Sequence, residues 1–278
     1  MKKLKTPLRY PGGKSRVADQ LMKWFPEQIA EFREPFLGGG SVAIAFSKAN
    51  PDIPVWVNDK YDYLYNFWTV LQDYGDDLSD VLQAIKLEHD DEPKAKELFI
   101  NAKEEIHEAD SFRQAVLFWI LNKCSYSGLT ENSAFSATAS RQNFTVRGAK
   151  ALKEYSDIIQ SWSITNYDYT DLMQEPGEDI FVFLDPPYMI GSYLYGSNAA
   201  LHKEFDHDWF AQSCKACPHK WMVTYNVKDE ISEAFSEYEQ RNFHITYGMQ
   251  HRRDNRKQEL LITNYEVEPL TPVELLYV

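Results

Sequence analysis

Short apolar runs that stop abruptly at an acid or a turn residue constrain the fold of this chain more than any other feature. FVFL leads directly into Asp185 and two prolines, VWVN leads into Asp59, and WMVTYN occupies residues 221–226. Runs in which nearly every residue is apolar are typical of strands in parallel sheets that helices cover on both faces. HITYG and ELLITNY near the C-terminus complete the predicted set of strands.

Helical patterns separate these runs. Residues 17–25 and 42–49 place apolar side chains at helical spacing, and Ser41 stands where an N-cap would satisfy the start of the second helix. Because strands and helices alternate, we predict an α/β fold with a parallel sheet.

The alternation is interrupted at residues 61–160. Asp59 and Asp185 are 126 residues apart (185 − 59), although adjacent strands of one sheet are normally separated by one helix. We therefore predict a catalytic domain from residues 1–60 and 161–278, with an inserted domain at 61–160. Two apolar stripes predict that the insertion is mostly helical, and its polar stretch at 123–148 should form a long loop or hairpin. The stripes are Leu78, Val81, Leu82 and Ile85, and Phe112, Val116, Trp119 and Ile120.

The net charge of −13 over 278 residues argues against a protein that coats nucleic acid nonspecifically. The basic residues are nevertheless clustered, at 5–16, 141–153 and 251–257. A polyanion-binding face on an acidic body needs such segregation, while solvated basic loops would give the same pattern.

The cysteines and the apolar runs point to a cytoplasmic protein without a metal. The longest apolar run, AVLFWIL, is too short to span a bilayer, so no membrane partner is expected. Cys214 and Cys217 form a C-x-x-C with His219 nearby, but a structural zinc needs four ligands. We expect free thiols, no metal, and no obligate protein partner.

A glycine-rich turn follows the first predicted strand, in EPFLGGGSVAIAF. Glycines let a backbone approach a ligand closely, and the helix that follows favours polar or negative groups at its N-terminus. The dinucleotide fingerprint fails because Ala43 stands where its third glycine is expected, and PGGKSR fails as a phosphate loop because position 8 is Leu8. Asp59 comes about twenty residues after the glycines, where a carboxylate meets a ribose in doubly wound sheets; a simple turn at Asn58–Asp59 is the alternative.

The tetrapeptide DPPY makes a rigid cluster of hydrogen-bond acceptors beside an aromatic ring. Two prolines fix the backbone and offer only carbonyls, and Asp185 adds a carboxylate. A planar exocyclic amine, as on adenine or cytosine, presents two donors in the plane of a ring that can stack. The alternative is a strand stopped by proline and followed by a packed Tyr188.

Six short motifs, in matching order, resemble the DNA adenine N6-methyltransferases of the Dam type, the D12 class. LRYPGGKSR resembles the N-terminal motif of the family, whose aromatic residue and lysine contact S-adenosylmethionine; these are Tyr10 and Lys14 here. EPFLGGGSV resembles the F-x-G-x-G cofactor motif, at Phe36, Gly38 and Gly40.

The remaining motifs extend the resemblance over most of the chain. VNDKYDYLYNFW resembles the motif whose acid binds the cofactor ribose, at Asp59. NYDYTDLM resembles the D-F pair near the cofactor adenine, at Asp168 and Tyr169, with tyrosine in place of phenylalanine. DPPY resembles the catalytic motif, from Asp185 to Tyr188, and RKQELLITNY resembles the C-terminal motif.

The resemblance implies a Rossmann-like methyltransferase sheet whose insertion is a target-recognition domain. It implies that the protein binds S-adenosylmethionine and double-stranded DNA and methylates N6 of adenine at specific sites. The target adenine would be flipped out of the duplex and stacked on Tyr188, with its N6 hydrogens accepted by Asp185 and the carbonyl of Pro186. Mismatch-repair marking, restriction–modification and phage self-protection all stay open as biological roles.

Basic residues in two of the charge clusters are the predicted contacts to DNA phosphates. Asn143 is predicted to read an adenine edge. The phosphate contacts are Arg141, Arg147, Arg252, Arg253 and Lys257.

Three other functions are compatible with the sequence. The same catalytic residues would serve an amino-methyltransferase that acts on RNA or on cytosine N4. A catalytically silent DNA-binding or regulatory protein would fit the acidic charge and the polar stretch at 123–148, whose arginine and asparagine spacing departs from that of the DNA-reading hairpin in the family it resembles. A Rossmann oxidoreductase is less well supported, because the dinucleotide fingerprint is absent.

Overall fold

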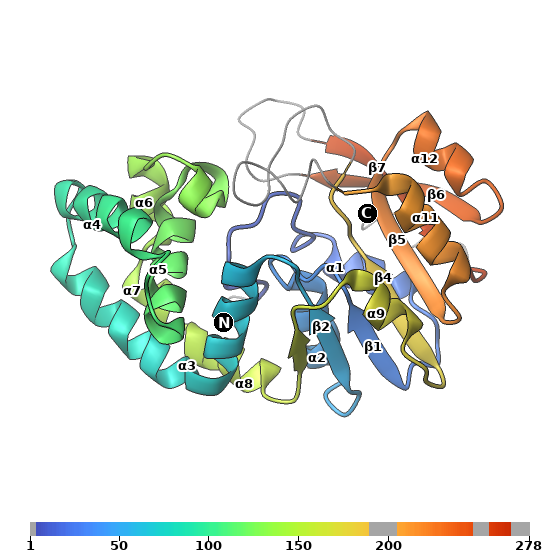
Figure 1. The fold of residues 1–278 in the computed structure, drawn as a ribbon, viewed down its shortest axis with the longest axis horizontal. Helices are drawn as coiled ribbons and strands as arrows, with labels where there is room; N and C mark the ends of the chain where they lie inside the picture. Colours follow the sequence, from blue (N-terminus) through green and yellow to red (C-terminus); the bar gives the residue numbers. More distant parts are fainter. Residues whose placement is uncertain (1–3, 189–204, 247–255, 268–278) are drawn as a thin grey trace.

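A single mixed sheet of seven strands organises the molecule (Figure 1), in the order β3-β2-β1-β4-β5-β7-β6. The computed structural model describes residues 4–188, 205–246 and 256–267. The strands are β1 (Glu31–Glu34), β2 (Val55–Asn58), β3 (Ser163–Thr165), β4 (Ile180–Leu184), β5 (Lys220–Asn226), β6 (Glu239–Thr246) and β7 (Arg256–Thr263).

Strands β1 to β5 pair in parallel, as the apolar runs predict. Strand β7 runs antiparallel to β5, with Thr224 opposite Leu261, and β6 pairs antiparallel with β7 at the edge. The predicted α/β class is therefore confirmed, while an entirely parallel sheet is wrong because the last two strands form an antiparallel pair. The order changes direction between β1 and β4, and ligands bind at such a switch point in open α/β sheets.

Both faces of the sheet are covered, which explains why its strands are apolar throughout. Phe181 and Phe183 of β4 belong to one apolar cluster with helix α2 (Ser41–Ala49) and the short α1 (Ala18–Leu21) and η1 (Met22–Trp24). Val182 and Leu184 point to the other face, into a cluster with α11 (His207–Ala216) and α12 (Asp229–Ala234). Helix α9 (Tyr169–Gln174) precedes β4 and contributes to the second cluster.

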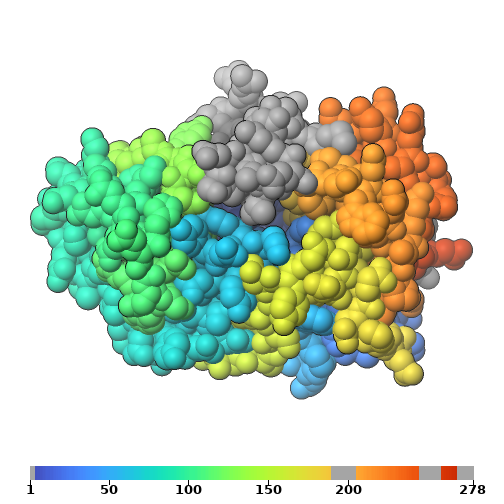
Figure 2. All heavy atoms as spheres, viewed as in Figure 1, coloured from blue at the N-terminus to red at the C-terminus, as the bar shows by residue number. Residues whose placement is uncertain are grey.

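Helices fill the interval between β2 and β3, on the left in Figure 1, so the expectation of a mostly helical segment holds. Figure 2 shows them on the opposite side of the molecule from β5, α11 and α12. The apolar cluster runs without a break from the sheet into these helices. Their bounds are α3 (Asp62–Glu88), α4 (Glu92–Glu105), α5 (Ser111–Cys124), η2 (Tyr126–Gly128), η3 (Thr130–Asn132), α6 (Ala137–Asn143), α7 (Val146–Lys150) and α8 (Leu152–Ile159).

The sequence prediction for this segment fails in two details. Val81 belongs to the predicted buried stripe of α3 but is exposed. The polar stretch after α5 forms short helices rather than the expected long loop or hairpin, and the described residues 123–148 contain one isolated β-bridge, between Ser125 and Phe135. Among the described residues, no helix combines the length and the apolar character needed to cross a membrane.

The turn between β1 and α2 corrects another expectation. Ser41 is the first residue of α2 rather than the residue that caps it. The N-cap is Gly40, in the left-handed conformation at φ 65°, which costs glycine little. A β-carbon at Gly40 would lie 2.7 Å from Cζ2 of Trp68, so the indole of α3 fills the space where a side chain would stand.

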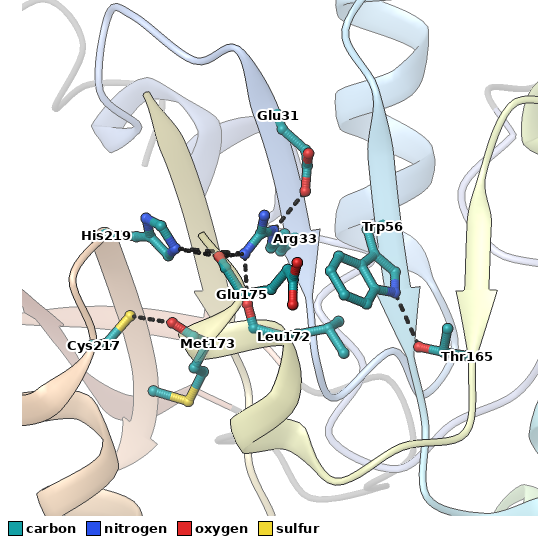
Figure 3. A network of polar contacts seen from close by, with 9 residues as sticks. All are labelled: Glu31, Arg33, Trp56, Thr165, Leu172, Met173, Glu175, Cys217 and His219. Atoms are coloured by element: carbon teal, nitrogen blue, oxygen red, sulfur yellow. Dashed lines mark hydrogen bonds and ion pairs between the residues drawn. The ribbon is translucent and has the colours of Figure 1, made fainter. Parts of the chain in front are cut away.

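A buried arginine on β1 holds that strand against the end of α9 (Figure 3). Nη1 of Arg33 donates to the carbonyl oxygens of Leu172 at 2.9 Å and Glu175 at 2.6 Å, and Nε pairs with Glu31. These carbonyls end α9 without intrahelical partners, so the arginine caps the helix. Sγ of Cys217 contacts the carbonyl oxygen of Met173, so the C-x-x-C packs against the same helix end.

Candidate active site

A cavity of about 730 Å³ lies at the carboxyl ends of the parallel strands, over the switch point between β1 and β4. Ten of the predicted cofactor-binding and catalytic residues line it, although they come from five separate stretches of sequence. Gly40 is not part of the lining, because its α-carbon faces Trp68. The ten are Tyr10, Lys14, Phe36, Gly38, Asp59, Asp168, Tyr169, Asp185, Pro186 and Tyr188.

Asp59 is fixed at the end of β2 by two backbone amides. Oδ2 accepts from N–H of Gly38 at 2.8 Å and Oδ1 accepts from N–H of Tyr61 at 3.0 Å. Burial raises the pKa of Asp59 to about 6, although both amide hydrogen bonds act to lower it. The carboxylate therefore faces the cavity in a set orientation and keeps lone pairs for further donors.

Gly38 is needed for a close approach between two loops. Its φ is 50°, and a β-carbon there would lie 2.9 Å from Cε1 of Tyr10. The ring of Tyr10 thus rests directly on the glycine turn, and the N-terminal loop forms one wall of the cavity.

An amide on α5 anchors that N-terminal loop, which sequence reasoning did not anticipate. Oδ1 of Asn122 accepts from N–H of Arg9 at 2.9 Å, and Nδ2 donates to the carbonyl oxygen of Arg9 at 2.8 Å. The next residue, Lys123, is also buried and donates through Nζ to the carbonyl oxygen of Pro7. The signal for this anchor in the sequence is the polar pair Asn122 and Lys123 at the end of the apolar run AVLFWIL. Buried polar side chains require hydrogen-bond partners, so such a pair indicates a contact with another segment.

Aromatic side chains cover the end of the cavity that lies between the glycine turn and α9. The rings of Phe36 and Tyr169 have centroids 5.1 Å apart, and Phe205 lies 5.8 Å from each. Asp168 caps α9 by accepting from N–H of Thr170 at 3.0 Å. A flat apolar wall beside a carboxylate suits a heterocycle that carries polar edges.

Asp185, the first residue of the DPPY motif, is paired with a buried lysine. Nζ of Lys14 lies 2.7 Å from both Oδ1 and Oδ2 of Asp185 and 3.1 Å from the carbonyl oxygen of Gly12. The hydroxyl of Thr224 donates to Oδ1 at 2.8 Å. Burial is the largest single influence on the pKa of Lys14 and acts to lower it, but the charges of Asp185, Glu259 and Glu34 and the hydrogen bond to Asp185 together raise it above its usual value. Lys14 is 2% exposed and Asp185 is 19% exposed, so the pair opens to the cavity on the aspartate side.

Glu259 is a buried acid at this site that the sequence did not reveal. Its Oε2 accepts from the hydroxyl of Tyr188 at 2.9 Å and lies 3.7 Å from Nζ of Lys14. Burial raises the pKa of Glu259 to about 7, partly offset by Lys14 and reinforced by Asp185. In the run RKQELLITNY the acid looks like an outward-facing strand residue, and only the pairing of β7 beside β5 turns it inward.

Glu34 at the end of β1 is a second unpredicted acid that lines the cavity. Its Oε2 accepts from N–H of Ala43 at 2.8 Å, near the start of α2. Burial raises the pKa of Glu34 well above its usual range, and the nearby charge of Asp185 adds to this effect. The walls of the cavity therefore hold more acidic than basic groups, which favours a cationic ligand.

The predicted DNA contacts are only partly within the described residues. Arg141 on α6 and Arg147 on α7 are exposed. Nδ2 of Asn143 donates to the carbonyl oxygen of Ala139 at 2.8 Å, within its own helix. Arg252 and Arg253 lie outside the described residues, as does the side chain of Lys257.

The sheet defines the fold class of the protein. The seven-stranded mixed sheet with helices on both faces is a Rossmann-like α/β fold, as the sequence predicts. A precorrin-6y C5,15-methyltransferase from Geobacter metallireducens aligns with 88% of this chain and 85% of its own, at a TM-score of 0.36 and 10% identity.

The family follows from the sequence itself. The model of the D12 class N6 adenine-specific DNA methyltransferases matches residues 10–253, and the chain belongs to this family. The chain is 25% identical over 196 residues to the type II methyltransferase M.MjaIII of Methanocaldococcus jannaschii, covering 65% of this chain and 68% of that protein. It is 27% identical over 196 residues to the DNA adenine methylase of Escherichia coli K12, covering 68% of this chain and 66% of the relative.

Proposed function

We propose that this protein transfers a methyl group from S-adenosylmethionine to N6 of adenine at specific sites in double-stranded DNA. The observation that carries the proposal is the shared cavity. The DPPY corner opens into the same space as the glycine turn and Asp59, so the target amine and a nucleoside cofactor would meet there. Membership of the D12 class supports adenine in DNA as the acceptor.

The residues that line the cavity fit the cofactor. Asp59 offers lone pairs to the ribose hydroxyls, while Phe36 and Tyr169 offer a flat surface to the adenine ring. The excess of buried acids suits a ligand that carries a sulfonium and an ammonium charge. S-adenosylmethionine, when bound, supplies an electrophilic methyl group.

The DPPY corner would activate the target amine by holding its hydrogens. The N6 lone pair of adenine is delocalised into the ring, so the amine is a poor nucleophile. Asp185 and the carbonyl of Pro186 accept the two N6 hydrogens, which localises the lone pair on nitrogen. A carboxylate is too weak a base to deprotonate a neutral amine beforehand, so Asp185 takes a proton only after N6 has become cationic, and its charge stabilises that cation.

Reaching the cavity requires that the adenine leave the duplex, because inside it the base is stacked and one N6 hydrogen is held by the paired base. The ring of Tyr188 would stack on the extruded base. Helices α3 to α8 would form the target-recognition domain, with Arg141 and Arg147 among its phosphate contacts and Asn143 reading a base edge; Arg252, Arg253 and Lys257 would add contacts from the other side.

The test compares the protein with Asp185→Asn, using labelled S-adenosylmethionine and unmethylated plasmid DNA. The proposal expects label in DNA with the wild type, and a rate about 10² to 10⁴ lower with the variant, since the variant loses both the proton acceptor and the charge. Digestion to nucleosides should yield N6-methyladenine. Label in cytosine or only in RNA would refute the stated acceptor, and no label from the wild type would favour a silent DNA-binding protein.

A further inference from the structure

The charge pair at the DPPY corner raises a question that the proposed function leaves open. Both oxygens of Asp185 accept from Lys14, and Oδ1 also accepts from Thr224. These three hydrogen bonds take three of the roughly four lone-pair sites of the carboxylate, and the ammonium of Lys14 neutralises its charge. An amine that is to bind Asp185 as its main partner therefore has to displace at least one N–H of Lys14.

A buried ammonium that turns away needs another acceptor nearby, because an unpaired charge of this kind is costly. Glu259 meets that need. Its Oε2 is already 3.7 Å from Nζ of Lys14, and its Oε1 is buried without a hydrogen-bond partner among the described residues. Glu259 is 2% exposed, so solvent does not satisfy this oxygen.

We propose that Glu259 is a positioning residue that receives the ammonium of Lys14 when the amino group of the target base takes its place on Asp185. This inference rests on the proposed function. The lysine side chain is flexible, so a small rotation brings Nζ within hydrogen-bond distance of Glu259 while Gly12 keeps its contact. The exchange releases Oδ2 of Asp185, the oxygen whose described donor is Lys14 alone.

The exchange also explains why an acid is buried on β7 at all. Oε2 of Glu259 holds the hydroxyl of Tyr188, and Nζ of Lys14 lies 5.0 Å from the centre of that ring. Tyr188, Lys14 and Glu259 are thus in mutual contact. They are the ring that would stack on the base, the cation paired with Asp185 and the alternative acceptor for that cation. Entry of a base beside Tyr188 would displace Lys14 toward Glu259.

The exchange depends on pH, because only an ionised Glu259 attracts the ammonium strongly. Among the described residues, the titratable groups that face Glu259 are Lys14 from the N-terminal loop and Asp185 and Tyr188 from the loop after β4. Burial raises the pKa of Glu259 to about 7. The value of kcat/KM for DNA should therefore rise with pH through an ionisation near neutrality.

Three variants of the full chain test the proposal, each measured for kcat/KM on unmethylated plasmid DNA from pH 5.5 to 8.5. Glu259→Gln keeps the shape and an acceptor for Tyr188 but loses the charge, so kcat/KM at pH 8 should fall about 10- to 100-fold and lose the ionisation near neutrality. Glu259→Asp retains a carboxylate and should recover part of the rate and the ionisation. Tyr188→Phe retains the carboxyl of Glu259, so its profile should keep the ionisation whatever its rate, moved to a higher pH because the hydrogen bond that lowers the pKa of Glu259 is lost.

The outcomes separate this proposal from the proposed function. If the wild type methylates DNA and Glu259→Gln matches it in rate and pH profile, the exchange is refuted while the enzyme assignment stands. If Tyr188→Phe loses the ionisation as fully as Glu259→Gln does, Glu259 acts only by holding Tyr188, which also refutes it. Thermal unfolding of each variant shows whether it is folded. If Glu259→Gln does not fold, the pH profiles of kcat/KM for Glu259→Asp and Tyr188→Phe are compared instead, and that comparison decides. A wild type that methylates no DNA overturns both.

Discussion

At the scale of single residues, the site is built from buried carboxylates. Hydrogen bonds and the charge of Lys14 offset only part of the cost of removing their charged forms from water. Glu34, Asp59 and Glu259 all have raised pKa values, because burial penalises their charged forms. Lys14 is the buried cation that faces the acids of the DPPY corner. Free of ligand, this arrangement carries an electrostatic cost that a cationic cofactor would reduce.

Asp59 gives a direct test of this cost. Its pKa of about 6 lies above the usual value, so the carboxyl is mostly protonated at pH 5 and mostly ionised at pH 7. Only the ionised form offers its full set of acceptors to ribose hydroxyls. The affinity for S-adenosylmethionine should therefore rise up to about tenfold between pH 5 and pH 7, as measured by isothermal titration calorimetry.

Asp59→Asn provides the control for that measurement. The variant should bind S-adenosylmethionine more weakly at pH 7 and show little change in affinity across the same pH range. A wild-type affinity that falls as the pH rises, or a variant that retains the full pH dependence, would contradict the role of this carboxylate.

At the scale of elements, the sequence was most informative where a strand ends on the site. The runs that precede Asp59 and Asp185 were predicted correctly as β2 and β4, because continuous apolar residues signal strands that are buried on both faces. Contacts between elements distant in the chain were not accessible in this way. Asn122 anchors Arg9 across 113 residues, and the inward side chain of Glu259 depends on a strand pairing that no local pattern encodes.

The turn between β1 and α2 shows how a local rule is overridden. Ser41 has the side chain preferred at an N-cap, yet the chain uses Gly40 there, because the turn places Gly38 and Gly40 at positive φ angles and Trp68 of α3 packs its indole against Gly40. The helix start is set by the contact with Trp68 rather than by capping propensity.

Gly40→Ala should therefore destabilise the protein on two counts. The left-handed conformation costs a non-glycine residue about 1–2 kcal/mol, and the clash with Trp68 adds about 1–3 kcal/mol of overpacking. We expect a melting temperature lower by about 5–15 °C, measured by differential scanning calorimetry.

The double variant Gly40→Ala with Trp68→Phe separates the two costs. The smaller ring relieves the clash but not the backbone strain, so the double variant should lose less stability than the sum of the two single variants. Simple additivity of the two single effects would argue against a direct contact between these positions.

At the scale of the whole molecule, a net charge of −13 must coexist with a DNA substrate. Acidic side chains on α3 and in the connection between α3 and α4 pair with lysines: Lys153 lies 3.0 Å from Asp80, and Lys94 lies 2.9 Å from Asp90. The nearby carboxylates largely neutralise these two lysines, so their attraction for DNA phosphates is weak. Arg141 and Arg147, exposed on α6 and α7, are therefore the better phosphate contacts within the helical segment.

The salt dependence of DNA binding distinguishes phosphate contacts from a general effect of charge. Each contact releases counterions and contributes about 0.9 to the slope of log K against log salt concentration. Arg141→Ala with Arg147→Ala should therefore reduce the magnitude of the slope by about 2 in fluorescence-anisotropy titrations with duplex DNA. The matched control, Lys94→Ala with Lys153→Ala, removes the same amount of charge from cations that already pair with acids, and should leave the slope unchanged. Equal reductions in the two double variants would mean that binding responds to net charge alone, and an unchanged slope in the arginine variant would remove α6 and α7 from the DNA-binding surface.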